Sequence, residues 1–158
     1  MEQQALSPER IDALINPLRA HFDSGATRPF EARRKALLAL RAALRKHEEA
    51  LLEAMHSDMR KPRFEAYLSD IGLVHVEITY ALRHLREWMS VEHVPTPLAI
   101  QLASSTMHHE PLGLVLIVAP WNYPVLLLLS PLVGAIAAGN CAVVKPSNEG
   151  PRTAAVVE

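Results

Sequence analysis

The feature that most constrains this chain is a long segment without charge. Residues 111–144 carry no side chain that is ionised at neutral pH, whereas 29 of the 33 acidic and basic residues precede position 111. Such a segment either crosses a membrane or forms the buried centre of a folded domain. The choice between the two decides which classes of protein the chain can belong to.

A membrane-spanning helix fits this segment poorly. As one helix, its 34 residues would be about 51 Å long, well beyond a hydrocarbon core of about 30 Å. Pro120, Pro124 and Pro131 would interrupt it, at about 3 kcal/mol for each internal proline, and no basic cluster flanks it. The N-terminus lacks the pattern of a secretory signal and the chain has one cysteine, so we expect a cytoplasmic protein without a membrane partner.

Divided at its prolines and glycines, the segment alternates strands and helices. Residues 112–119 and 141–147 are short apolar runs, typical of strands buried on both faces. Between them, residues 124–138 form an apolar helical segment that stops at Gly139, and residues 151–158 begin another helix. This order predicts a parallel βαβ unit with a right-handed crossover.

Polar side chains follow both predicted strands, at the ends where ligands of parallel sheets bind. Asn122 could donate its amide protons to an oxyanion, or it could cap the following helix. Lys145 ends an otherwise apolar strand, where it could contact an anionic or hydroxyl-rich ligand or lie in solvent as an ordinary strand-end lysine. The residues alone leave both alternatives open.

The first part of the chain is charged and helical in pattern. Residues 8–60 place apolar side chains at helical spacing, with breaks expected at residues 25–29 and at Lys61, which precedes a proline. The net charge of −1 and the lack of a basic block predict no nucleic-acid partner. We expect no metal site, because the adjacent His108 and His109 would face opposite sides of a strand.

Residues 64–89 carry the longest periodic pattern of the chain. Its apolar stripe consists of Phe64, Leu68, Ile71, His75, Ile78, Leu82, Leu85 and Met89. This stripe predicts one long helix packed on the domain, or alternatively a coiled-coil seam for dimerisation. We interpret His75 as a core or boundary residue rather than a ligand, and residues 94–110 predict an extended arm or hairpin.

Three stretches of this sequence resemble the NAD(P)-dependent aldehyde dehydrogenase superfamily. Residues 110–124 read EPLGLVLIVAPWNYP, residues 131–140 read PLVGAIAAGN and residues 143–147 read VVKPS. Residues 61–72, KPRFEAYLSDIG, further resemble the class 3 branch, which includes coniferyl-aldehyde-type enzymes. The resemblance runs from about residue 10 to the end of the chain.

This resemblance implies oxidation of an aldehyde substrate to a carboxylic acid with NAD or NADP through a cysteine thioester. Asn122 matches the side-chain oxyanion donor, and Trp121 would shape the cofactor and substrate channel. Lys145 matches the lysine that contacts the adenosine ribose, and Ser147 and Asn148 follow it at cofactor-binding positions. The family commonly has a glutamate where this chain has Asn148, so we hypothesise looser selectivity for NAD over NADP.

The implied fold class is α/β: N-terminal helices, an extended arm, and the first βαβ part of an incomplete Rossmann-like parallel sheet. We expect a helical segment at residues 1–93, the arm at 94–110, and the truncated first part of the dinucleotide-binding domain at 111–158. The family's catalytic cysteine and glutamate would lie beyond residue 158. Cys141 starts a buried strand, and we interpret it as a packed thiol.

We therefore expect the N-terminal part of an enzyme, inactive as this chain alone. The full-length enzyme could be a homodimer, as class 3 relatives often are. The alternative is a non-catalytic helical protein, derived from that family, that dimerises or binds a partner through residues 64–89.

Overall fold

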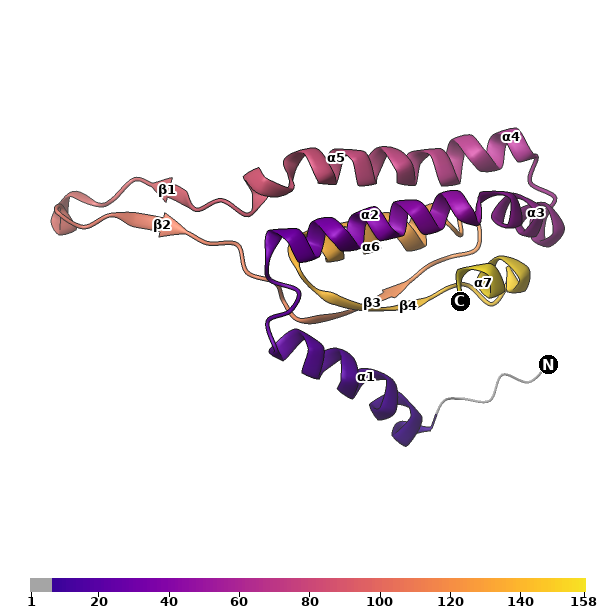
Figure 1. The fold of residues 1–158 in the computed structure, drawn as a ribbon, viewed down its shortest axis with the longest axis horizontal. Coiled ribbons are helices and arrows are strands. Elements are labelled where there is room, and N and C mark those ends of the chain that lie inside the picture. The colour runs from indigo at the N-terminus through magenta and orange to yellow at the C-terminus, as the bar shows by residue number, and fades with distance from the viewer. Residues whose placement is uncertain (1–6) are drawn as a thin grey trace.

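The computed structural model describes residues 7–158, and Figure 1 shows helices stacked over a small parallel sheet with a hairpin arm projecting from one end. The helices are α1 (Pro8–Asp23), α2 (Phe30–Lys46), α3 (Glu48–Met59), α4 (Arg63–Ala66), η1 (Tyr67–Ile71), α5 (Gly72–Trp88), η2 (Leu98–Ile100), α6 (Leu126–Ala138) and α7 (Pro151–Val157). The strands are β1 (Glu92–Val94), β2 (Ser105–Met107), β3 (Leu114–Val118) and β4 (Cys141–Lys145). This order confirms the predicted fold class.

The predicted βαβ unit is present. Strands β3 and β4 are parallel, with Leu114 opposite Cys141 and Val118 opposite Lys145. Helix α6 connects them and packs against one face of the sheet, and Ile117 and Leu128 belong to one buried apolar cluster there. The helix ends at Gly139, whose φ of +86° is a left-handed conformation that favours glycine.

The prediction that both strands are buried on both faces is wrong. Leu116 is 66% exposed and Val118 is 60% exposed, while Ile117 between them is buried. Because strand side chains alternate between the two faces, Ile117 points toward α6 and its neighbours point to the other face. Helix α1 lies against that second face and covers only part of it (Figure 1).

Helix α6 lies between the sheet and the N-terminal helices, which explains why its sequence is apolar on all sides. One side contributes to the cluster with β3 and β4, and the other packs against α2 and α5. The larger core cluster includes Leu37, Met55, Ile78, Leu85, Val125, Leu129 and Val133. The N-terminal helices and the βαβ unit therefore share one hydrophobic core.

Residues 63–88 form the predicted long helix, with one π-helical turn, η1, that the sequence did not predict. Ile71 and Ile78 are fully buried, but Phe64 is 76% exposed and Leu68 is also exposed. A π turn adds a residue to the helix and shifts the side chains on either side of it to different faces. From Ile71 onward, the apolar stripe therefore faces the chain's own core, and its first two residues do not.

The two breaks predicted in the helical part are present. The chain breaks at Gly25, whose φ is +76°, and α3 ends at Arg60 in a left-handed conformation just before Lys61. A further break at His47 separates α2 from α3. Strands β1 and β2 pair antiparallel as a hairpin from Glu92 to Met107, whereas the sequence predicts an arm or hairpin at residues 94–110. No helix in residues 7–158 is both long and apolar enough to cross a membrane.

Candidate functional site

The carboxyl ends of β3 and β4 lie side by side, as a parallel pair requires. Val118 pairs with Lys145, and the Ala119 N–H donates to the Lys145 carbonyl oxygen at 3.1 Å. The loops that leave the two strands, residues 119–125 and 146–150, therefore start at the same edge of the sheet. These loops, with Lys145 at the end of β4, carry all five residues that the sequence singled out as site candidates.

Three candidates lie at the end of β4 in one small polar loop. The Lys145 Nζ donates to the Pro146 carbonyl oxygen and to Asn148 Oδ1, each at 3.3 Å. The Ser147 Oγ accepts a hydrogen bond from the Glu149 N–H at 3.2 Å. Lys145 and Asn148 are exposed, so an ammonium, a hydroxyl and an amide are displayed together where a ligand with hydroxyl groups could meet them.

The same three side chains line one end of a groove of about 910 Å³ between α1 and the sheet. Ile11 and Leu14 of α1 form one apolar wall, and side chains of β3 and β4 form the other. A volume of this size falls within the range of about 300–1,000 Å³ found for small-molecule sites. Along its length the lining is mostly apolar, with Arg19 and Glu158 as exceptions, and it is polar at the strand ends.

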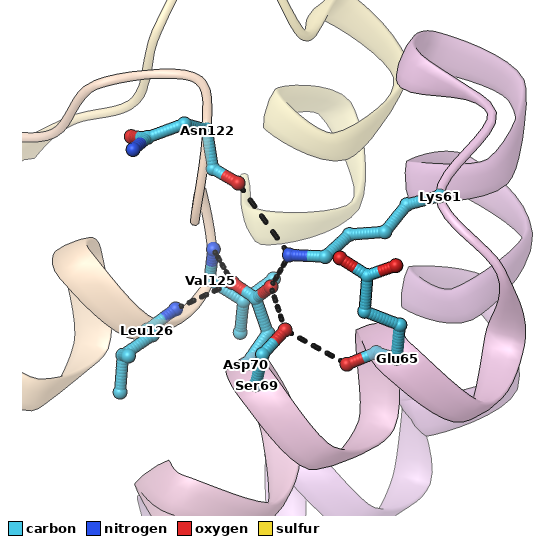
Figure 2. A network of polar contacts seen from close by, with 7 residues as sticks. All are labelled: Lys61, Glu65, Ser69, Asp70, Asn122, Val125 and Leu126. Atoms are coloured by element: carbon cyan, nitrogen blue, oxygen red, sulfur yellow. Dashed lines mark hydrogen bonds and ion pairs between the residues drawn. The ribbon is translucent and has the colours of Figure 1, made fainter.

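The other two candidates, Trp121 and Asn122, lie outside this groove, on the loop after β3. Both are exposed. The Asn122 side chain points away from the buried polar network beneath the loop, whereas its backbone carbonyl points into that network (Figure 2). The alternative that Asn122 caps the following helix is wrong, because α6 begins at Leu126 and its first N–H groups have another acceptor.

That acceptor is Asp70, a residue that sequence reasoning missed. Its Oδ1 accepts hydrogen bonds from the backbone N–H groups of Val125 and Leu126, each at 3.1 Å (Figure 2). The Asp70 Oδ2 accepts from Lys61 Nζ at 2.6 Å. The side chains of Asp70 and Lys61 are 0% and 6% exposed, so they form a buried ion pair at the start of α6.

Lys61 also reaches the loop that carries Trp121 and Asn122. Its Nζ lies 3.4 Å from the Asn122 carbonyl oxygen and 4.1 Å from the centre of the Tyr123 ring. An ammonium group over an aromatic face is attracted by the ring's quadrupole. Together with the bonds of Asp70, these contacts tie down most of the turn between β3 and α6.

One signal in the sequence could have pointed to Asp70. Helix α6 begins after Val125, which has no side chain able to accept a backbone hydrogen bond. A helix start that is buried without a local cap needs an acceptor from elsewhere in the chain. Asp70, adjacent to Ile71 of the apolar stripe, is the acidic residue that the π turn brings into the core.

Two other charged side chains hold the end of α6 and the start of α7. Arg33 is buried and donates to the Ala137 carbonyl oxygen at 3.0 Å, near the end of α6. Burial lowers the pKa of the Arg33 guanidinium. Asp58 accepts from the Arg152 and Thr153 N–H groups at 3.2 and 2.8 Å, at the start of α7. Anions at helix starts and a cation at a helix end match the helix dipole.

The single cysteine has the environment of a packed thiol. Cys141 is buried at the start of β4, opposite Leu114. Burial raises the pKa of the Cys141 thiol, which disfavours the nucleophilic thiolate. The geometry agrees with the interpretation made from the sequence.

Comparison with known proteins gives a consistent result. The profile of the aldehyde dehydrogenase family matches residues 1–158. Human aldehyde dehydrogenase family 3 member B1 is 50% identical over 133 residues, covering 84% of this chain and 28% of the relative. A dimeric NADP-preferring aldehyde dehydrogenase of Canis lupus familiaris is 41% identical over 138 residues, covering 87% of this chain and 30% of the relative.

The fold agrees with solved structures as well. The substrate-bound AldH of Staphylococcus aureus superposes with a TM-score of 0.91 at 38% identity, over 93% of this chain and 32% of that one. The chain therefore spans about a third of the length of the proteins it matches. The resemblance to the class 3 branch is confirmed by the family 3 relatives. The chain belongs to the aldehyde dehydrogenase family.

Proposed function

We propose that this chain is the N-terminal part of an NAD(P)-dependent enzyme that oxidises aldehydes to carboxylic acids. The observation that carries this proposal is the family match over the whole chain, combined with site candidates at the adjacent ends of two parallel strands. In this proposal, the cysteine nucleophile and the glutamate base come from residues beyond 158.

The role proposed for Asn122 follows from the charge that develops in this reaction. Attack of a cysteine thiolate on the aldehyde carbon turns the carbonyl oxygen into an oxyanion, and expulsion of hydride then gives a thioester, which water hydrolyses. The Asn122 amide, exposed and unoccupied by helix capping, donates a hydrogen bond to that oxyanion. Loss of one such donor typically costs about 10²–10³ in rate.

The residues at the end of β4 suit a nucleotide cofactor. NAD(P), when bound, accepts the hydride that leaves the aldehyde carbon. Lys145, Ser147 and Asn148 offer a cation, a hydroxyl and an amide to the hydroxyl groups of a ribose, at the strand end where such cofactors bind. Trp121, exposed on the neighbouring loop, shapes the channel by which cofactor and substrate approach.

Asn148 bears on the choice between the two cofactors. A neutral amide repels a 2′-phosphate less than the carboxylate that is common in the family, so the enzyme accepts both NAD and NADP. The NADP preference in the name of the canine relative agrees with this. Asn148→Glu should raise the ratio of NAD affinity to NADP affinity in the complete enzyme. Strong NAD preference in the wild type, abolished by changing Asn148 alone, would contradict the proposal.

The proposal extends to assembly and location. The complete enzyme is a cytoplasmic homodimer, an assembly supported by the word "dimeric" in the name of the canine relative. The competing function, a dimerisation protein built on residues 64–89, loses its main support in the fold. Ile71, Ile78 and Leu85 of that stripe are fully buried in the chain's own core.

An activity assay tests the proposal. The complete protein and a polypeptide limited to residues 1–158 are each mixed with NAD or NADP and a panel of aldehydes, and formation of reduced cofactor is followed by absorbance. The complete protein should turn over, and residues 1–158 should not, because two strands leave the parallel sheet incomplete. Turnover by residues 1–158, or none by the complete protein, would contradict it.

A further inference from the structure

The middle of the loop that carries Asn122, residues 121–123, is exposed, whereas Ala119 before it and Val125 after it are buried. Trp121, Asn122 and Tyr123 are all exposed, so the position of the Asn122 amide depends on the contacts of its backbone. Two side chains from far away in the sequence, on either side of α4, bond to the backbone there: Lys61 contacts the Asn122 carbonyl oxygen, and Asp70 accepts from the N–H groups just after it (Figure 2).

The two partners hold different parts of this loop. Asp70 Oδ1 binds the N–H groups of Val125 and Leu126, which fixes where α6 starts. Lys61 Nζ contacts the Asn122 carbonyl oxygen at 3.4 Å and the face of the Tyr123 ring at 4.1 Å. Capping of α6 requires only the carboxylate, so the contacts of the ammonium group with the loop are additional to the cap.

The position of the Asn122 amide matters as well as its presence. A side-chain donor stabilises an oxyanion only when it is held within hydrogen-bond distance of the place where the charge develops. A displacement of about 1 Å can cost on the order of 10²-fold in rate. The 3.4 Å contact between Lys61 Nζ and the Asn122 carbonyl oxygen is long for a hydrogen bond. Lys61 therefore fixes the loop backbone through two attractions of its buried ammonium group, one to the Asn122 carbonyl oxygen and one to the face of the Tyr123 ring.

We propose that Lys61, fixed by its ion pair with Asp70, is a positioning residue for the oxyanion donor Asn122. This inference rests on the proposed function, and it adds residues to the site that lie in the N-terminal helical part of the chain. The charge pair acts through the backbone of residues 122–125 and does not touch the substrate.

The variants must remove the hold on Asn122 without leaving a buried charge. Lys61→Met alone would leave the Asp70 carboxylate unpaired, which is strongly destabilising in a buried site. The double variant Lys61→Met/Asp70→Asn removes both charges. The amide oxygen introduced by Asp70→Asn can still accept from the N–H groups of Val125 and Leu126. The amide nitrogen takes the place of Asp70 Oδ2, 3.5 Å from Ser69 Oγ, which can accept its hydrogen bond. Lys61→Arg keeps the positive charge and tests whether a charged side chain at this position is enough to retain activity.

A matched control is available on the neighbouring turn. Arg63 forms an ion pair with Glu49, and both side chains are at least half exposed. Arg63→Met removes a cation two residues from Lys61 without touching the loop after β3. This variant should leave kcat/KM for the aldehyde within about twofold of the wild type, because exposed ion pairs contribute little.

The readout is a double-mutant cycle in the complete enzyme. The double variant should lower kcat/KM for the aldehyde by about tenfold to a hundredfold, with the dissociation constant of the cofactor unchanged and the thermal midpoint close to the wild type. Lys61→Arg should recover part of the loss. In the Asn122→Ala background, the double variant should cost no more than about twofold further, since residues that act as a unit are not additive.

The outcomes separate the two claims. An active wild type with full kcat/KM in the folded double variant would overturn the inference alone. So would a loss that adds in full to that of Asn122→Ala, because it would mean that Lys61 and Asp70 act without Asn122. A complete wild-type enzyme with no aldehyde oxidation would overturn the proposed function and this inference with it.

Discussion

At the scale of single residues, Gly139 has two reasons to be a glycine. Its φ is +86°, and an added Cβ would lie 2.7 Å from the Arg33 guanidinium carbon. Gly139→Ala should therefore lower the free energy of unfolding by about 1–2 kcal/mol from the left-handed backbone alone, and more if Arg33 loses its bond to Ala137. Urea denaturation measures the change.

Gly134 is the matched control for that substitution. It lies in the same helix, is exposed, and has no atom within 4 Å of an added Cβ. Gly134→Ala should raise the free energy of unfolding by about 0.5–1 kcal/mol, because alanine is the better helix former. If both substitutions changed stability equally, the account of Gly139 would be wrong.

His75 gives a prediction about pH. Burial lowers its pKa and Arg45 lowers it further, and its Nδ1 is buried without a hydrogen-bond partner among residues 7–158. The unfolded chain therefore binds the proton more readily than the folded chain. The stability from neutral His75 is complete above the ordinary pKa of about 6.5 and is lost as the pH falls through the lower pKa of the folded state.

The measurement compares the wild type with His75→Leu by urea denaturation. Between about pH 7.5 and about pH 5, the free energy of unfolding should fall more in the wild type than in the variant. Because both proteins share the other seven histidines, their contribution to the pH dependence is the same in both and drops out of the comparison. An equal fall in the two proteins would show that His75 does not contribute to the pH dependence.

At the scale of elements, charged side chains from the N-terminal helices hold the ends of α6 and α7. Asp58 of α3 accepts from the Arg152 N–H, the Thr153 N–H and the Thr153 Oγ1. Asp58→Ala should lower the free energy of unfolding by about 1–2 kcal/mol, as for loss of other helix caps. Hydrogen exchange should become faster in the amides of α7.

The control for Asp58 is on the same helix. Glu53→Ala removes an exposed carboxylate of α3 and should leave exchange in α7 unchanged. Faster exchange in both variants would point to a general loosening of α3, and unchanged exchange in Asp58→Ala would contradict the capping role.

Much of the element order could be predicted from the sequence, since it depends on local patterns. The break at residues 25–29, the hairpin and the βαβ unit follow from periodicity, glycines and prolines. The π turn at η1 could not be predicted, because the apolar stripe continues through it without interruption in the sequence. This unpredicted turn places Asp70 in the core. The exposure of Leu116 was missed because it depends on how much of the sheet α1 covers.

At the scale of the whole molecule, the helical part and the βαβ unit are one packed body. The core joins Leu37 and Ile78 of the N-terminal helices to Val133 of α6. The sequence could predict that Asn122 and Lys145 lie at the ends of adjacent strands, since parallel strands end at one edge of a sheet. It could not decide whether Asn122 caps α6 or donates to an oxyanion, because the same side-chain amide suits both roles. The acceptor that caps α6 is Asp70, 52 residues before Asn122 in the sequence.

The central claim is that Asn122 serves aldehyde oxidation from a loop held by the N-terminal helices. The most direct test is kcat/KM for aldehyde in the complete enzyme, wild type against Asn122→Ala. The account predicts a loss of about 10²–10³, with unchanged cofactor affinity and thermal midpoint, because the Asn122 side chain is exposed and caps no helix. A variant within about twofold of the wild type would contradict the account.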